Sequence, residues 1–110
     1  MNVSPIQPGQ ERLTHFRLYI AGQSPKSLSA ISNLYALCEA YMHGRHEIQI
    51  IDLLESPQQA ELHKIVAIPT LVRTAPEPVR RLIGDLSNTK KVLFELGIIP
   101  ERLLPDGPQR

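Results

Sequence analysis

The residues of this chain that could carry out chemistry are few and widely spaced. Its one cysteine, Cys38, rules out both an intrachain disulfide and a CxxC redox pair. Cys38 falls on the apolar stripe of a predicted helix, which indicates a buried structural thiol. The four histidines are spread along the chain, and His43 and His46 flank a glycine, a poor spacing for a shared metal ion. We therefore expect no redox chemistry, metal site or cofactor.

The other candidate catalytic groups have structural explanations. Ser24, Ser56 and Ser87 each stand where a predicted helix begins, so we expect them to cap helices rather than act as nucleophiles. Asp52 and Glu55 could form a carboxylate pair, but they lie where a strand leads into a helix, and a solvated pair is the simpler expectation. No segment matches a P-loop or a dinucleotide-binding fingerprint. The sequence offers no reaction, and we expect a protein that is not an enzyme.

Composition and charge narrow the class of protein further. Twelve Lys and Arg residues against eleven Asp and Glu give a formal charge of +1, which argues against nucleic acid as the main partner. No apolar run approaches the roughly 18–20 residues of a membrane span, and the N-terminus lacks a signal pattern. We expect a cytoplasmic protein with one domain at residues 13–99, a flexible leader at 1–12 and a flexible tail at 100–110.

The first half of the domain reads as strand, helix, strand. From Thr14 the residues HFRLYI alternate between apolar and polar, which predicts a strand. Ser24 and Pro25 supply a helix cap and a first-turn proline, and Gly44 ends the helix. The segment HEIQIIDLL, residues 46–54, predicts a second strand, parallel to the first because a long helix connects them. The apolar positions of that helix are Leu28, Ile31, Leu34, Tyr35, Cys38, Tyr41 and Met42.

A short helix and a third strand come next. Ser56 and Pro57 repeat the pattern of cap and proline, Gln59 completes a capping box, and the helix should reach about Val66. The segment IVAIPTL then reads as a buried strand interrupted by Pro69. A cis-proline at the first residue of a strand breaks no ladder hydrogen bond, so we expect Pro69 to begin the third strand in the cis form.

The chain closes with a turn, a strand and a helix. The proline-rich turn at 75–78 leads into a strand at 79–85, and a helix capped by Ser87 should end at Gly97. The resulting order, β-α-β-α-β-β-α, is thioredoxin-like. A thioredoxin-like redox protein carries a reactive cysteine at the start of the first helix. Here that stretch, residues 21–27, reads AGQSPKS and has no thiol.

The amino-acid sequences of four segments resemble those of the KaiB family, small clock proteins of cyanobacteria with relatives in other bacteria. These segments are LYIAGQSP, IQIIDLLESPQQAE, AIPTL and PVRRLIGDLSN. The last is the most specific, because AIPTL alone would fit any thioredoxin relative. The resemblance runs from about residue 16 to about residue 94. The N-terminal domain of the KaiC-interacting sensor kinase is also similar.

The resemblance implies a non-enzymatic regulator that docks on KaiC, a hexameric ATPase and kinase, and modulates its phosphorylation state. It implies KaiA or a sensor kinase as further partners, and a homodimer or homotetramer. KaiB proteins adopt two folds: a thioredoxin-like form that binds KaiC, and a resting tetramer whose second half is rearranged. The resting-state fold is therefore the alternative fold for this chain.

Five residues bear on a switch between these forms: Pro69, Pro76, Pro78, Glu95 and Gly97. Prolines isomerise slowly, which suits a switching half. The clock proteins usually have glycine where Glu95 stands and aspartate where Gly97 stands, and both changes favour the last helix. We therefore expect this chain to prefer the thioredoxin-like form. Compared with the cyanobacterial proteins, the acidic tail is missing and a proline at position 100 replaces an aromatic residue, so the resemblance indicates a paralogue or a relative outside the clock.

Charged residues in the matching segments are the expected partner contacts: Arg17, Lys64, Arg73, Arg80 and Arg81. Adjacent arginines must point to opposite faces of their strand, and on an edge strand they would also discourage stray pairing. For Arg80 and for Arg81, protection of the strand edge and partner binding are both open. Lys64 could equally pair with Glu61 three residues earlier.

Two other functions stay open from the residues alone. The first alternative is a redox-inactive thioredoxin-like module that binds another protein in stress adaptation. A weaker one is a glutathione-dependent activity that uses a serine near Ser24.

Overall fold

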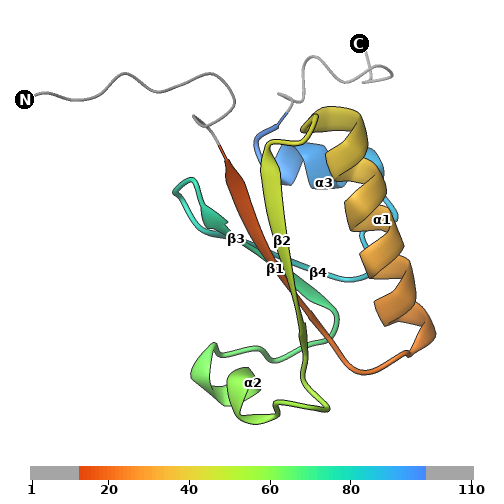
Figure 1. The fold of residues 1–110 in the computed structure, drawn as a ribbon, viewed down its shortest axis with the longest axis vertical. Coiled ribbons are helices and arrows are strands. Elements are labelled where there is room, and N and C mark those ends of the chain that lie inside the picture. The colour runs from red at the N-terminus through yellow and green to blue at the C-terminus, as the bar shows by residue number, and fades with distance from the viewer. Residues whose placement is uncertain (1–12, 99–110) are drawn as a thin grey trace, which may run out of the picture.

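The computed structural model describes residues 13–98, so the expected leader at 1–12 and tail at 100–110 lie outside the described residues. Seven elements follow one another in the predicted order β-α-β-α-β-β-α (Figure 1). They are β1 (Thr14–Ile20), α1 (Pro25–Tyr41), β2 (His46–Asp52), α2 (Gln58–Leu62), β3 (Thr70–Ala75), β4 (Arg80–Ile83) and α3 (Thr89–Glu95). Within this range, no helix combines the length and the hydrophobicity needed to cross a membrane.

The four strands form one mixed sheet in the order β2-β1-β3-β4. β1 and β2 run parallel and pair over seven residues, from Thr14 opposite His46 to Ile20 opposite Asp52. β3 is antiparallel to β1, and β4 is antiparallel to β3. The predicted parallel pair and the predicted edge position of β4 are therefore confirmed. The peptide bond before Pro69 is cis and β3 begins at the next residue, also as expected.

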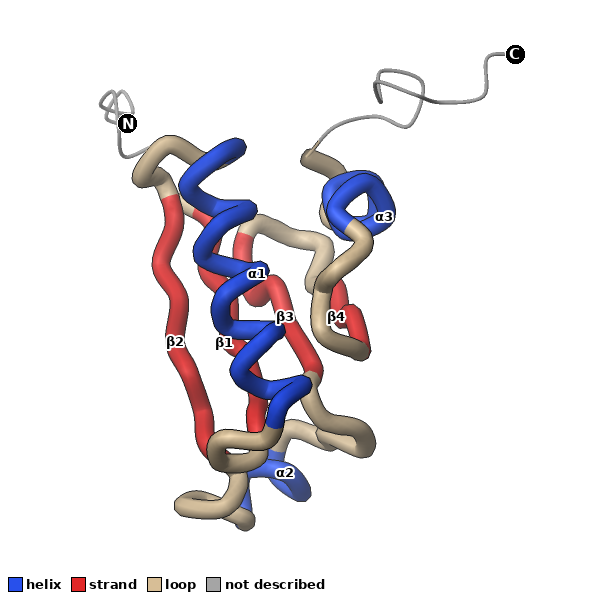
Figure 2. The backbone as a smooth tube through the Cα atoms, turned by 90° about the vertical axis from the view of Figure 1, so that its right-hand side faces the viewer, coloured by secondary structure: helices blue, strands red, loops and turns tan. Residues whose placement is uncertain are grey.

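The main core lies between one face of the sheet and the helices α1 and α3, which both cover that face (Figure 2). β1 supplies alternate apolar residues to it, and α1 supplies Ala30, Leu34, Leu37 and Cys38. This helical face is spaced at intervals of four and three residues, as a buried stripe requires. Three residues expected on the stripe point elsewhere and are 40–49% exposed: Leu28, Tyr35 and Tyr41.

A smaller core lies on the opposite face of the sheet, under α2. It consists of Tyr19, Leu53, Ile65 and Val72. None of the five residues of α2 is itself buried. The helix therefore covers one end of this face, near the C-terminal ends of β1 and β2 (Figure 1), and leaves the remainder of the face open.

The helix ends follow the sequence signals in part. Ser24 caps α1 as expected: its Oγ accepts the Ser27 N–H at 3.3 Å. The capping box predicted for α2 is wrong, because Pro57 occupies the cap position and no side chain caps it. The Ser56 N–H instead donates to the Asp52 carbonyl, so Ser56 belongs to the preceding turn. α2 also ends four residues before Val66.

α3 is capped by Asn88 rather than by Ser87. The Asn88 side chain accepts the Lys91 N–H at 3.1 Å, and Ser87 lies one residue too early to do so. At the other end, Gly97 adopts φ +72° and terminates the helix as expected. The N–H groups of Gly97 and Ile98 return to the carbonyls of Phe94 and Leu93, which is a Schellman motif.

Substitution of Ser87 and of Asn88, one at a time, tests which residue caps α3. We expect Asn88→Ala to lower the free energy of unfolding by about 1 kcal/mol, because an orphan N–H of a short helix loses its acceptor. Ser87→Ala keeps that cap and should cost less. Urea denaturation of both variants measures the difference, and an equal or larger loss in Ser87→Ala would assign the cap to Ser87 after all.

Candidate functional site

Three of the five expected contact residues line one hollow on the open face of the sheet. This basic hollow has a volume of about 270 Å³. Its lining residues are Arg17, Tyr19, Leu62, His63, Lys64, Val72, Thr74 and Arg81. None of these described residues carries a carboxylate, so positive charge dominates the hollow.

Strand alternation places the floor of the basic hollow. Phe16 and Leu18 point into the main core, so Arg17 and Tyr19 point to the opposite face of β1. Arg17 is half-buried, and within residues 13–98 its guanidinium has no hydrogen-bond or ion-pair partner. It also borders the two neighbouring hollows on this face. Arg17 is therefore the central cation of the open face.

A part-buried contact between Tyr19 and His63 lies in the wall of the basic hollow. Tyr19 is 1% exposed, and its Oη lies 2.6 Å from Nδ1 of His63, with the rings edge to face at 5.7 Å between centroids. A neutral His63 that accepts this bond carries its proton on Nε2. His63 thus has a structural partner. Among the described residues, no cluster of three His, Cys, Asp or Glu side chains could hold a metal ion.

Lys64 occupies an unusual backbone position at the end of α2. Its φ is +57°, in the left-handed region that lysine rarely adopts. The N–H groups of Lys64 and Ile65 return to the carbonyls of Glu61 and Ala60, so α2 ends in a Schellman motif with lysine where glycine is usual. The Lys64 side chain is exposed, and it has no ion-pair partner, Glu61 included, in the described part of the chain.

Arg81 reaches the same segment from the edge strand. Its Nη2 donates to the carbonyl of His63 at 2.7 Å, and its Nη1 donates to the carbonyl of Lys64 at 2.9 Å. These are two carbonyls at the helix end that have no acceptor role within α2. Arg81 therefore joins β4 to the end of α2.

The remaining two arginines lie elsewhere, which differs from our expectation for Arg73. Arg73 is 8% exposed, and its guanidinium donates to the carbonyls of Leu96 and Pro78. Burial, with Arg80 nearby, lowers the pKa of Arg73. Arg73 therefore joins the end of α3 to the turn before β4 and offers little surface to a partner. Arg80 is exposed and lies on the opposite side of β4 from Arg81.

The side chains that could act as nucleophiles or as acids and bases, Cys38, Ser24 and Asp52, are buried or hydrogen-bonded in structural roles. Cys38 is fully buried in α1, and burial raises the pKa of its thiol to about 11. Ser24 caps α1, and its Oγ also contacts Ser27 Oγ at 2.8 Å. Asp52 Oδ1 accepts the N–H groups of Gly22 and Leu54, both at 2.9 Å. Asp52 therefore fixes two loops instead of pairing with a second carboxylate.

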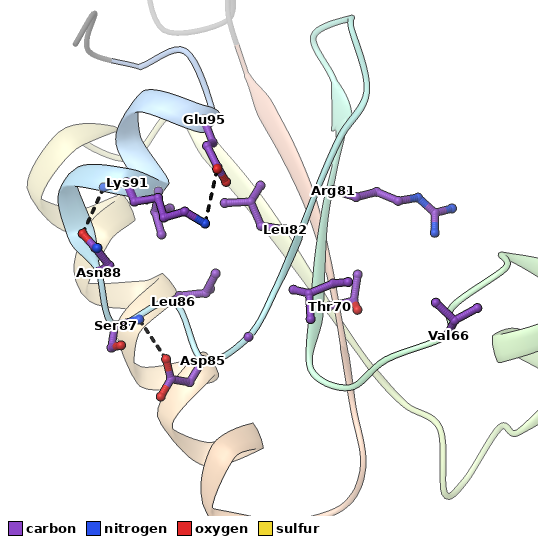
Figure 3. A pocket seen from close by; sticks show the side chains of 13 residues that line it. Val66, Thr70, Arg81, Leu82, Asp85, Leu86, Ser87, Asn88, Lys91 and Glu95 are labelled. Carbon is purple, nitrogen blue, oxygen red and sulfur yellow. Dashed lines mark hydrogen bonds and ion pairs between the residues drawn. The ribbon is translucent and has the colours of Figure 1, made fainter. Parts of the chain in front are cut away.

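A larger hollow of about 430 Å³ lies between β4 and α3 (Figure 3). Four of its polar residues are engaged in pairs: Lys91 pairs with Glu95 at 3.3 Å, and Asp85 accepts the Ser87 N–H at 3.0 Å. Hydrogen bonding from the side chain and the backbone of Ser87 lowers the pKa of Asp85. This hollow could not be predicted from the sequence, because its walls come mainly from β4, α3 and the loop between them, and only the tertiary packing brings them together.

Comparison with known proteins shows the family to which this chain belongs. The family model described as the KaiB domain matches residues 17–98. The chain belongs to the KaiB family. It is 49% identical over 87 residues to the circadian clock protein KaiB3 of Synechocystis, which covers 79% of this chain and 85% of that protein. It is 45% identical to the circadian clock oscillator protein KaiB of Prochlorococcus marinus, over 79% of this chain and 76% of that protein.

Solved structures show the same thioredoxin-like architecture. The N-terminal domain of SasA from Synechococcus elongatus matches with a TM-score of 0.67 and 21% identity, over 91% of this KaiB-family chain and 96% of that domain. Chloroplastic thioredoxin z matches with a TM-score of 0.65 and 24% identity, over 80% of each chain. At these identities the likeness establishes the fold. The predicted family and fold class are both confirmed.

The burial of Arg73 leads to a prediction about stability. We expect Arg73→Gln to lower the free energy of unfolding by about 1–3 kcal/mol, because the carbonyls of Leu96 and Pro78 lose a charged donor. Arg80→Gln removes the same charge from an exposed neighbour and should change stability by no more than about 0.5 kcal/mol. Chemical denaturation compares the two. Equal stabilities would show that Arg73 is not a structural tie.

Proposed function

We propose that this KaiB-family protein is a regulatory binding protein that docks on a KaiC-type hexameric ATPase and modulates its phosphorylation state. Its relatives are named as circadian clock proteins, which supports a regulatory role in a clock or a clock-like timing system. The basic hollow is the docking surface of this proposal, with Arg17 and Lys64 as the contacts. The proposal places the protein in the cytoplasm and assigns it no reaction.

The observation that carries the proposal is the backbone conformation of Lys64. Glycine at this position would carry no steric strain, whereas lysine at φ +57° has a steric cost of about 1 kcal/mol. Strain of this kind concentrates at functional sites, where the surrounding structure maintains it. A charged side chain that is exposed and unpaired gains little for the fold itself. Binding of an acidic group on a partner would give this exposed, unpaired side chain a role that the fold does not.

Charge explains how such a surface would choose its partner. The whole chain carries a net charge of only +1, so the positive potential of the hollow is local. Cations gathered on one face speed association with an acidic surface and oppose docking on a basic one. The hollow therefore favours a partner that presents carboxylates to Arg17 and Lys64.

We further propose that the thioredoxin-like form is the binding form and that Glu95 and Gly97 favour it. Glu95 pairs with Lys91 one turn earlier in α3, and Gly97 terminates that helix without strain. KaiA or a sensor kinase as further partners, and assembly into a homodimer or homotetramer, are proposals that rest on the family alone.

Substitution of Lys64 tests the docking surface without damage to the fold. We expect the free energy of unfolding of Lys64→Gly to equal that of the wild type or to exceed it by up to about 1 kcal/mol, because glycine suits the left-handed position. The same variant should bind a purified KaiC-type ATPase from the same genome about three- to tenfold more weakly, because an interfacial cation is lost. Calorimetry or biolayer interferometry at two salt concentrations measures this.

Arg80→Gln is the matched control, since it removes one positive charge from the other side of the sheet and should bind as the wild type does. Absence of binding by the wild-type protein would refute the proposed function. Unchanged affinity in Lys64→Gly, with binding intact in the wild type, would instead show that docking uses another surface.

A further inference from the structure

The segment His63–Lys64 is held by contacts from three elements: β1, α2 and β4. Nδ1 of the His63 ring lies at hydrogen-bond distance, 2.6 Å, from the hydroxyl of the buried Tyr19 of β1. The N–H groups at the end of α2 return into the helix, through Lys64 and Ile65. The carbonyls of His63 and Lys64 accept the two Nη groups of Arg81 from β4. No other exposed segment among residues 13–98 combines a left-handed non-glycine residue with a two-pronged arginine contact.

We propose that Arg81 is a positioning residue of the docking surface: it holds the carbonyls of His63 and Lys64 and thereby fixes the Lys64 side chain at the basic hollow for contact with a partner carboxylate. The inference rests on the proposed function and deepens it. It separates Arg17 and Lys64, which touch the partner, from Arg81, which acts through Lys64.

The geometry of the Arg81 guanidinium supports this role over direct contact. A guanidinium is a rigid planar fork, and here both terminal nitrogens already have acceptors at hydrogen-bond distance. Figure 3 shows the Arg81 side chain directed away from α3, toward the side of the sheet on which Val66 lies. A partner carboxylate that engaged the same two nitrogens would have to displace both carbonyls. Arg17, by contrast, has all its donors available within the described residues.

The strain at Lys64 explains why such a clamp is needed. The left-handed conformation is unfavourable for lysine, and α2 has five residues, none of them buried, so the helix alone provides little stability. Without Arg81, the end of α2 would lose two charge-assisted hydrogen bonds to carbonyls that no other group of the helix satisfies. The orientation of the Lys64 side chain would then be averaged over many conformations, and binding would have to restore it.

Amide hydrogen exchange tests the clamp in the absence of any partner. The N–H groups of His63, Lys64 and Ile65 are all hydrogen-bonded within the helix end, so each can report local opening. We expect Arg81→Gln to increase exchange at these three amides by about tenfold and to leave the amides of α1 unchanged. Arg80→Gln should change neither set. Unchanged exchange at the three amides in Arg81→Gln would overturn the proposal.

A double-mutant cycle tests how the clamp acts on binding. With the KaiC-type ATPase as the probe, Arg81→Gln should weaken binding about threefold or more in the wild-type background and have no further effect in Lys64→Gly. Additive losses would show that Arg81 touches the partner itself and would overturn the proposal. Arg81→Lys keeps the charge without the planar pair of donors, so its exchange protection and its affinity should fall together. Full affinity with lost protection would also refute the positioning role.

The two experiments separate this inference from the proposed function. If the wild-type protein does not bind the ATPase, the docking proposal fails, and hydrogen exchange still decides whether Arg81 fixes the end of α2. If binding is observed and exchange is unaffected by Arg81→Gln, the docking proposal stands and the positioning role fails.

Discussion

The pairing of β1 with both of its neighbours is the constraint on which the rest of this structure depends. β1 lies inside the sheet, with β2 parallel on one side and β3 antiparallel on the other. Since side chains alternate along a strand, one register fixes two opposite surfaces at once. Phe16 and Leu18 enter the main core, and Arg17 and Tyr19 must then face the other side. A slip of one residue would bury Arg17 and expose the core.

The order of elements, the parallel pair and the edge position of β4 could be predicted because each follows from patterns within a few residues. The glycine that ends α3 was readable for the same reason. Two kinds of feature were not predictable. The choice of Asn88 over Ser87 depends on a shift of one residue in the helix start, which two adjacent good caps cannot settle. The exposed side of α1 depends on which face of the helix packs on the sheet, and the exposed Leu28 has the same side chain as the buried Leu34 and Leu37.

The two Schellman motifs show why part of the site was invisible in the sequence. Both α2 and α3 end with the same pair of backbone hydrogen bonds. α3 has Gly97 in the left-handed position, and a glycine after a helical pattern predicts such an end. α2 has Lys64 in that position, and a lysine does not predict a left-handed residue. The contact expected of Lys64 came from family resemblance, whereas its strain and its link to Arg81 needed the three-dimensional arrangement.

The arginines of β3 and β4 show how position decides what a side chain does. Arg73 is buried and donates to carbonyls at the end of α3 and in the turn before β4, whereas Arg81 donates to carbonyls at the end of α2 on the opposite face of the sheet. Each therefore joins the sheet to the C-terminal end of a short helix. Since α2 buries none of its residues, the half of the basic hollow that carries Lys64 is only as rigid as these anchors, while Arg17 stands on the most firmly paired strand. A partner that engages both cations would meet Arg17 on a strand paired on both sides and Lys64 on a helix end held by Arg81 and Tyr19. Because these contacts exist before binding, docking would have less disorder to remove at Lys64.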